Sequence, residues 1–193
     1  MEPSLIIVRE VFGENCRFEG DNMPKYGITS RMEKENELTL EKIFEVPRER
    51  LFEMFSKSEH LENFWGPRGW ELIHSSMDFK EGGEWFYGMQ DTDSSQDNYG
   101  MKSWGMAVYE EIVEPEKLVY VDCFTDKSGE INRELPVAKT VVTFDQLDEE
   151  RSVLISRTEY QSEEELQKLV DAGMLQGIAE TWDRLSEYLE KNK

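Results

Sequence analysis

An amphipathic segment at the end of the chain limits the folds that are open to it. Ser162 and Glu165 have the spacing of a capping box at its start. After them, apolar residues recur every three or four positions, which predicts one long helix with a single apolar stripe. Such a stripe needs an apolar surface of matching length to pack against. Its members are Leu166, Leu169, Val170, Met174, Ile178, Trp182, Leu185 and Leu189.

Six strand-like runs precede this helix and can supply that surface. They span 70–77, 84–89, 101–112, 117–124, 139–147 and 152–160. Short turns or polar loops separate them, which favours consecutive antiparallel strands. Before them, 38–44 alternates like another strand, and Pro47 followed by Leu51 and Phe55 indicates the first of two short helices. We therefore predict an α+β fold: a curved antiparallel sheet wrapped around the C-terminal helix, with two short helices after the first strand.

The first 36 residues differ from the rest. A strand-like run near Leu5 is followed by an irregular stretch with glycines and Pro24. Two interpretations stay open. Residues 1–36 form an extension that adds a strand to a sheet edge, or the natural start lies further along, at Met23 or Met32.

Composition excludes several classes of function. The chain has 42 acidic and 22 basic residues, a net charge of −20, so phosphate backbones and anionic lipid surfaces would repel it. We expect neither a nucleic-acid nor a membrane partner. Cys16 and Cys123 are far apart and no Cys/His cluster is present, which argues against a disulfide scaffold and a metal site. No secretory signal or membrane span is evident, so we expect a cytoplasmic protein.

Five stretches resemble, in order and spacing, the motifs of one known family. Residues 60–70 are similar to its H-L-x-x-W-W-G-P-x-G-F signature, and 79–85 to its F-x-P-G-G-x-W. The family is that of the Activator of Hsp90 ATPase homologues, within the START-like (SRPBCC) helix-grip superfamily. The resemblance covers roughly 38–189 and implies a helix-grip domain over 37–193. The other three similar stretches are 111–120, 140–144 and 177–189.

The resemblance implies less about function than about fold. The family takes its name from eukaryotic proteins in which this domain, together with a separate N-terminal domain, stimulates a chaperone ATPase. The 36 residues before the matched region are too few to supply such a second domain. We therefore treat a chaperone partner as an alternative.

A sheet curved around one helix usually leaves a gap in which apolar ligands bind. Strand alternation indicates which side chains face that gap. The strand at 101–112 is ambiguous: Ala107 and Tyr109 form one face, Trp104, Met106 and Val108 the other, and we favour the second as the inner one. The predicted cavity residues are Trp85, Tyr87, Met89, Trp104, Met106, Tyr120, Asp122, Phe124, Val142, Phe144, Ile155, Arg157, Glu159, Met174, Ile178 and Trp182.

Three of these predicted cavity residues are ionisable. A buried charge must be paired because desolvation is costly. We expect Arg157 either to bridge Asp122 and Glu159 or to bind a ligand carboxylate through its planar guanidinium. The alternatives are a one-residue error in strand phase or a solvated position near the mouth of the cavity.

No catalytic set is evident. His60 and His74 are the only histidines, and neither has a nucleophile nearby in the sequence. The predicted function is binding of a hydrophobic or amphipathic small molecule, without a cofactor. A protein-interaction or chaperone-regulating module is the alternative. A cyclase- or hydrolase-like enzyme that uses Asp122 or Glu159 is the third. Whether the chain forms a homodimer stays open.

Overall fold

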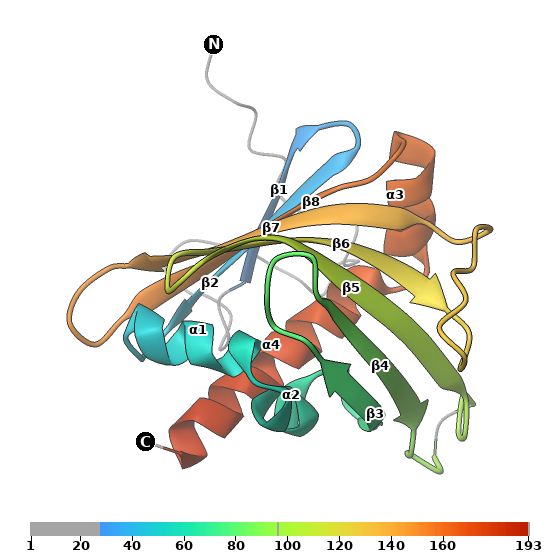
Figure 1. Ribbon diagram of the computed structural model, residues 1–193, viewed down its shortest axis with the longest axis horizontal. Helices are drawn as coiled ribbons and strands as arrows, with labels where there is room; N and C mark the ends of the chain where they lie inside the picture. Colours follow the sequence, from blue (N-terminus) through green and yellow to red (C-terminus); the bar gives the residue numbers. More distant parts are fainter. Residues whose placement is uncertain (1–27, 96, 193) are drawn as a thin grey trace, which may run out of the picture.

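The computed structural model describes residues 28–95 and 97–192 (Figure 1). Within them, eight strands form one sheet and four helices accompany it. The strands are β1 (Ile28–Lys34), β2 (Glu37–Phe44), β3 (Trp70–Met77), β4 (Glu84–Asp91), β5 (Lys102–Val113), β6 (Lys117–Thr125), β7 (Val137–Gln146) and β8 (Ser152–Glu159). The helices are α1 (Arg48–Ser56), α2 (Ser58–Phe64), α3 (Glu163–Asp171) and α4 (Met174–Lys191).

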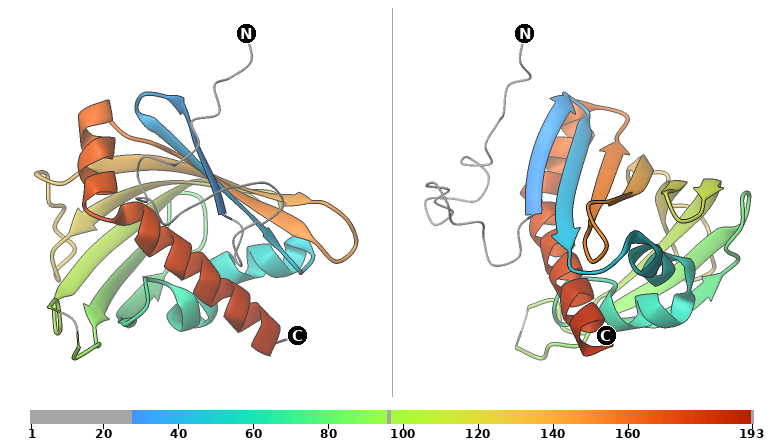
Figure 2. Two further views of the ribbon diagram at one scale, coloured as in Figure 1. Left: turned by 180° about the vertical axis from the view of Figure 1, so that it is seen from behind. Right: turned by 90° about the vertical axis from the view of Figure 1, so that its left-hand side faces the viewer.

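The sheet is antiparallel throughout, with strands in the order β1-β2-β8-β7-β6-β5-β4-β3. It curves, and α4 crosses its concave face diagonally while α1 and α2 lie at the C-terminal end of α4 (Figure 2). The predicted architecture is confirmed. Among the described residues, no helix combines the length and the apolar character needed to cross a membrane.

Strand β1 comes from the segment expected to be an extension. It pairs with β2 from Ile28 opposite Lys42 to Lys34 opposite Glu37, and it forms one edge of the sheet. This pairing agrees with the alternative in which the extension adds an edge strand. The strand expected near Leu5 lies outside the described residues, and the domain boundary at residue 36 stays a prediction.

The C-terminal segment forms two helices where one was expected. Ser162 caps α3 as predicted, because its hydroxyl accepts a hydrogen bond from the Glu165 backbone N–H. The helix stops at Asp171, and Gly173 has a φ of 89°, a left-handed conformation that glycine adopts without steric cost. The apolar stripe continues beyond the break on α4.

Helices α1 and α2 close one half of the concave face. Phe144 on β7 is fully buried, and its ring packs edge-on against Phe52 and Phe55 of α1 at 5.2 and 5.5 Å. Leu61 and Phe64 of α2 are also fully buried. This half therefore holds a conventional apolar core under the C-terminal part of α4.

Candidate functional site

The other half of the concave face is different, and strand register shows which residues form it. Trp85 and Tyr87 on β4 lie opposite Ala107 and Gly105 on β5. Side chains of directly paired residues lie on the same face of a sheet. The ring of Trp85 contacts that of Trp65, which follows α2, so this set faces the helices.

Asp122 on β6 belongs to this inner set. Its cross-strand neighbours are Ala107 on β5 and Ala138 on β7. Both neighbours have side chains that end at Cβ, but Ala107 is buried in the core whereas Ala138 is partly exposed. Asp122 is therefore flanked by small side chains, and the side toward Ala138 is the more open one.

Gly105 allows a tyrosine to reach this carboxyl. A Cβ atom at position 105 would lie 2.5 Å from the Tyr87 hydroxyl oxygen, closer than real contacts allow. The Tyr87 ring therefore lies across the glycine backbone. Its hydroxyl donates a hydrogen bond of 3.4 Å to Oδ1 of Asp122. A glycine on β5 thus lets a β4 side chain contact a β6 carboxyl.

The surroundings of Asp122 change its acidity. Burial raises the pKa of its carboxyl to about 7, although hydrogen bonds from the Tyr87 hydroxyl and the Cys123 backbone lower it. Burial also raises the pKa of Tyr87 and Tyr120, and the neighbouring Asp122 charge adds to both shifts. The same two causes raise the pKa of Tyr160 to about 12. A carboxyl and three neutral phenols therefore share one polar environment.

Solvent reaches this environment. Tyr120 and Asp122 keep partial exposure although they face α4, and so do Ser156 and Thr158 on β8. On the helix side, Met174 and Ile178 are likewise only half-buried. We call the region that these partly exposed side chains line, between β4–β8 and the N-terminal half of α4, the inner hollow.

Polar contacts fix α4 at the far end of the inner hollow. The buried Lys42 ammonium donates to the Trp182 carbonyl at 3.0 Å and to the Asp183 carboxylate at 2.9 Å. Arg184 donates to the carbonyls of Gly66 and Trp70 at 2.7 and 3.0 Å, which holds the loop after α2 against the helix. The C-terminal half of α4 is therefore attached to both the sheet and this loop.

The sequence-based choice of face on β5 was wrong. Trp104 and Met106 lie opposite Gly88 and Phe86, on the face away from α4. The Trp104 ring stacks on Phe86 at 5.5 Å and contacts His74 at 5.8 Å. The inner positions belong to Gly105, Ala107 and Tyr109. The small residues are inside because the Tyr87 ring and the Asp122 carboxyl need the space.

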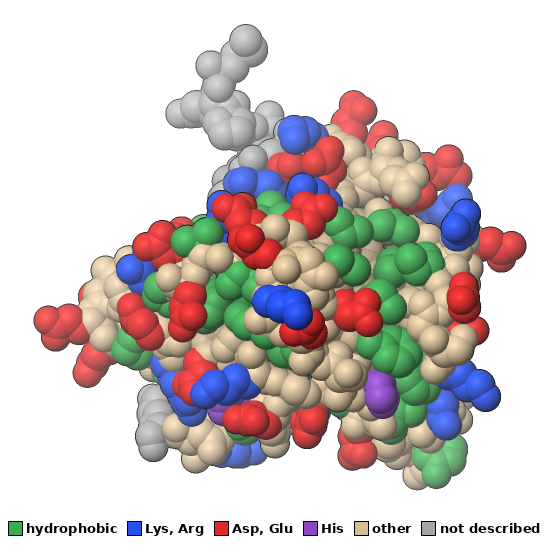
Figure 3. Space-filling model, in the orientation of Figure 1, with side chains coloured by type: hydrophobic (Ala, Val, Ile, Leu, Met, Phe, Trp, Pro, Cys, Tyr) green, Lys and Arg blue, Asp and Glu red, His purple; other side chains and the backbone are tan. Residues whose placement is uncertain are grey.

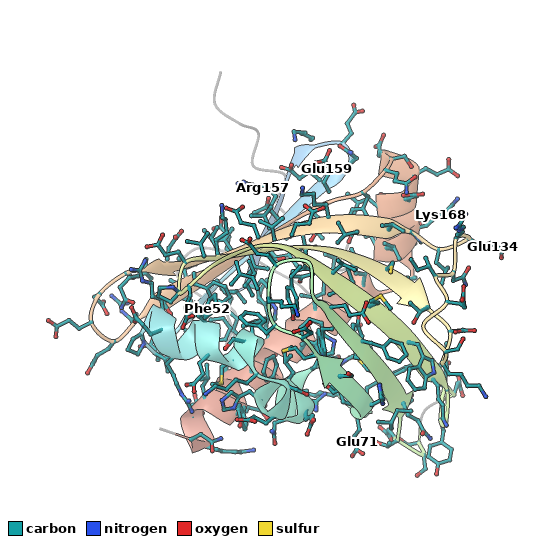
Figure 4. All side chains as sticks on the ribbon, in the orientation of Figure 1. Phe52, Glu71, Glu134, Arg157, Glu159 and Lys168 are labelled. Carbon is teal, nitrogen blue, oxygen red and sulfur yellow. The ribbon has the colours of Figure 1, made fainter. Side chains whose placement is uncertain are left out.

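The phase chosen for β8 was also wrong. Leu154, Ser156 and Thr158 pair with the inner residues of β7, so the predicted Ile155, Arg157 and Glu159 lie on the opposite face. Figure 4 labels Arg157 and Glu159 on β8, which pairs with β2, and Arg157 lies 3.6 Å from Glu37 of β2. The rule that apolar residues point inward fails on β8 because its inner face contacts water. Polar residues line that face, and Val153 and Ile155 point outward. No bridge from Arg157 to Asp122 forms.

The remaining predicted cavity residues face the helices, but they divide between two environments. Phe144, Val142 and Trp182 are buried in the packed core. The others lie in or beside the inner hollow: Trp85, Tyr87, Met89, Tyr120, Asp122, Phe124, Met174 and Ile178.

Sequence reasoning missed several residues of the inner hollow. They are Gly105, Ala107, Tyr109, Ala138, Ser156, Thr158 and Tyr160. A signal was available on β5, where Gly105 and Ala107 alternate with bulky neighbours. That pattern marks a strand whose small residues make room for side chains from adjacent strands.

A separate surface cleft of about 590 Å³ lies between α2, the start of β3 and the end of α4. Two of its three cationic residues already have protein partners: Arg184 holds backbone carbonyls, and Arg68 lies 2.6 Å from Glu187. Over the described ranges, no cluster of His, Cys, Asp or Glu could hold a metal ion. Cys123 is a buried free thiol. His60 Nδ1 lies within hydrogen-bond distance, 3.0 Å, of the Tyr188 hydroxyl.

A curved antiparallel sheet that holds a C-terminal helix, with two short helices beside it, defines a START-like helix-grip protein. The family model described as "Activator of Hsp90 ATPase homolog 1-like protein" matches residues 45–190. The chain belongs to this family. Among curated proteins no significant match is found.

Solved structures agree with this assignment. A protein from Arthrobacter aurescens is 25% identical, with a TM-score of 0.75 over 84% of this chain and 91% of that one. Protein Ms6760 from Mycobacterium smegmatis is 25% identical, with a TM-score of 0.72 over 84% and 94%. The AHSA1 protein from Silicibacter pomeroyi is 19% identical, with a TM-score of 0.63 over 81% and 99%, and shows a shared fold.

Proposed function

We propose that this protein binds a small hydrophobic or amphipathic molecule in the inner hollow. The observation that carries the proposal is the partial solvent exposure of Tyr120, Asp122, Met174 and Ile178 in the space between sheet and helix. Apolar and aromatic walls with a few convergent polar groups are typical of small-molecule sites. The inner hollow combines the partly exposed side chains of Tyr120, Met174 and Ile178 with one carboxyl group, and the buried rings of Trp85 and Tyr87 lie beneath them on β4.

The test compares two substitutions on β7. Ala138→Phe places a ring into the inner hollow beside Asp122, whereas Val137→Phe adds the same ring on the opposite face, next to Cys123. Native mass spectrometry of the freshly purified protein is expected to show a bound mass that denaturation releases. The neutral fluorophore N-phenyl-1-naphthylamine should bind to wild type and to the Val137→Phe variant, and about tenfold more weakly to Ala138→Phe. Equal binding of the fluorophore to all three proteins would contradict the proposed site.

The outer face of the sheet favours a second candidate function, interaction with another protein. His74, Phe86 and Trp104 form an aromatic cluster there, and exposed Ile73 adjoins it in sequence. Figure 3 views this face and shows hydrophobic side chains gathered over the strands between acidic groups. Apolar patches of this kind mark interaction surfaces. If the partner is an Hsp90-type chaperone, as the family name suggests, the purified protein should raise its ATPase rate, and Trp104→Ala should abolish the increase.

A further inference from the structure

Asp122 is a carboxyl group on the concave face that no cation accompanies. The polar contacts of Asp122 are the Tyr87 hydroxyl and the Cys123 backbone, and within the described residues none of its partners is basic. A carboxylate removed from bulk water without a counter-charge is unfavourable, and natural proteins usually pair such groups. The absence of a cationic partner for Asp122 therefore needs an explanation.

The cations that could have served are committed elsewhere. Lys42 faces α4 and contacts Asp183 and the Trp182 carbonyl. Arg184 is held by backbone carbonyls of the loop after α2. Arg157, which the sequence suggested as a clamp for a ligand carboxylate, lies on the opposite face with Glu37. The sequence had suggested an anionic ligand held by Arg157. With Arg157 on the other face and Asp122 on the inner one, a cationic ligand is favoured instead.

The surroundings of the carboxyl suit a cation that arrives with a ligand. Asp122 is partly exposed, and so is its small neighbour Ala138 on β7, so a ligand can approach from that side. Tyr120, two residues before Asp122 on β6, is also partly exposed and can present its ring to a ligand, whereas Tyr87 is buried and stacks on Trp85 with ring centroids 4.4 Å apart. Aromatic faces next to a carboxylate stabilise a bound ammonium group through cation–π attraction.

We propose that the molecule bound in the inner hollow is an amphipathic amine whose protonated nitrogen pairs with the Asp122 carboxylate and whose apolar part packs between the sheet and α4. This inference rests on the proposed function and adds the chemical class of the ligand to it. The net charge of −20 acts in the same direction, because it attracts small cations and repels anions.

The groups that surround Asp122 decide how binding of an amine should depend on pH. They are Tyr87 on β4, Tyr120 on β6 and Tyr160 after β8, with Cys123 adjacent on the chain, and burial raises the pKa of each. On α4, the residues packed against this side of the core are Met174 and Ile178, which do not titrate. Between pH 5 and pH 8, Asp122 is therefore the group in this set that changes charge.

The experiment uses three probes that share one apolar body: 4-phenylbutylamine, 4-phenylbutanol and 4-phenylbutyrate. Calorimetric titration of the full chain at pH 8 should give an affinity for the amine about tenfold above that for the alcohol, the effect of one charge-assisted hydrogen bond. The carboxylate should bind most weakly. Between pH 8 and pH 6 the affinity for the amine should fall about tenfold, because a carboxyl with a pKa near 7 becomes protonated. The affinity for the alcohol should stay constant.

Two variants distinguish the effect of the Asp122 charge from the effect of the net charge of the protein. Asp122→Asn is nearly isosteric and should remove the preference for the amine without weakening the alcohol. Asp145→Asn removes the same charge from an exposed position on β7 and should leave the preference intact.

Four results would be adverse, and they differ in what they overturn. Equal affinity of wild type for amine and alcohol, or tighter binding of 4-phenylbutyrate, would overturn this inference and leave small-molecule binding in place. The same holds if Asp122→Asn keeps the preference. Absence of binding by all three probes, together with absence of a releasable bound mass, would overturn the proposed function itself. Should Asp122→Asn fail to fold, the probe series and pH dependence in wild type decide alone.

Discussion

Where α4 passes α1 and α2, the concave face of the sheet is dry, and where α4 begins, after α3, the same face is open to water. In the first region Phe144, Leu61 and Leu185 are fully buried. In the second, Asp122, Tyr120 and Ile178 are partly exposed. The two regions share one sheet and one helix, so the difference comes from side-chain size and polarity. Packing in one half supplies stability that allows the other half to keep a hollow and a carboxyl group.

The largest effect is expected from a cavity made in the dry half. Phe144→Ala removes a fully buried ring that packs between Phe52 and Phe55, and it should lower the free energy of unfolding by about 3 to 5 kcal/mol. Urea unfolding at fixed pH measures this loss. The matched ring removal in the wet half, Tyr120→Ala, should cost less, because Tyr120 is already partly exposed to water. Similar losses for the two variants would remove the distinction between the halves.

A smaller effect, of opposite sign, is expected from Asp122→Asn. In the unfolded chain an aspartate titrates near pH 4, whereas burial raises the pKa of folded Asp122 to about 7. Below pH 4 both states hold the proton, so variant and wild type should be equally stable. As the pH rises from 4 to 7 the unfolded chain ionises first, and wild type should lose stability relative to the variant.

At pH 8 the Asp122→Asn variant should be more stable than wild type by about 2 to 3 kcal/mol, less than the full shift implies because the group keeps some contact with water. Thermal unfolding of both proteins from pH 4 to pH 8 gives the comparison. A stability difference that does not change with pH would show that Asp122 titrates normally.

The next effect concerns the glycine that lets Tyr87 reach across β5. Gly105→Ala places a methyl group 2.5 Å from the Tyr87 hydroxyl oxygen, so the ring must move, at a cost of about 1 to 2 kcal/mol. Gly177→Ala is the matched control. It lies on α4 with open space around its Cβ position and should be neutral or stabilising, by up to about 1 kcal/mol. Equal effects of the two substitutions would mean that the close approach at Gly105 has no energetic consequence.

The smallest effect is expected from Tyr87→Phe, which removes only the hydroxyl group that donates to Asp122. The loss should be about 0.5 to 1 kcal/mol, because the hydrogen bond is long at 3.4 Å. That bond lowers the pKa of Asp122, so its removal should move the carboxyl titration above pH 7. Carbon-detected NMR of the Asp122 carboxyl follows this shift. An unchanged titration midpoint would exclude Tyr87 as a partner of the carboxylate.

The same contrast explains what could be predicted from the sequence. Where an inner side chain of β4 or β7 is large and apolar, alternation identifies it correctly, as for Trp85, Val142 and Phe144. The order of strands and helices follows from turns and from the helical stripe. The break at Gly173 was not predicted, because apolar spacing continues through it and glycine within an amphipathic segment gives only a weak signal.

On β5 and β8 the rule that apolar residues point inward fails. Met106 and Ile155 point outward, while Gly105, Ser156 and Thr158 point toward the inner hollow. Hydrophobicity predicts orientation where burial drives packing, and the wall of a hollow that contacts water has the opposite pattern. The residues that sequence reasoning missed are therefore concentrated at the candidate site.

Gly173, at the junction of α3 and α4, also bears on how fast a ligand bound as proposed would exchange with solvent. Lys42 and Arg184 attach the C-terminal half of α4 to the sheet and to the loop after α2, whereas Met174 follows directly on a residue with left-handed backbone geometry. A displacement of α3 can be absorbed at Gly173 while the attached half of α4 stays in place. A ligand bound as proposed would then enter and leave at a rate set by a local fluctuation, far faster than the global unfolding that the packed core resists.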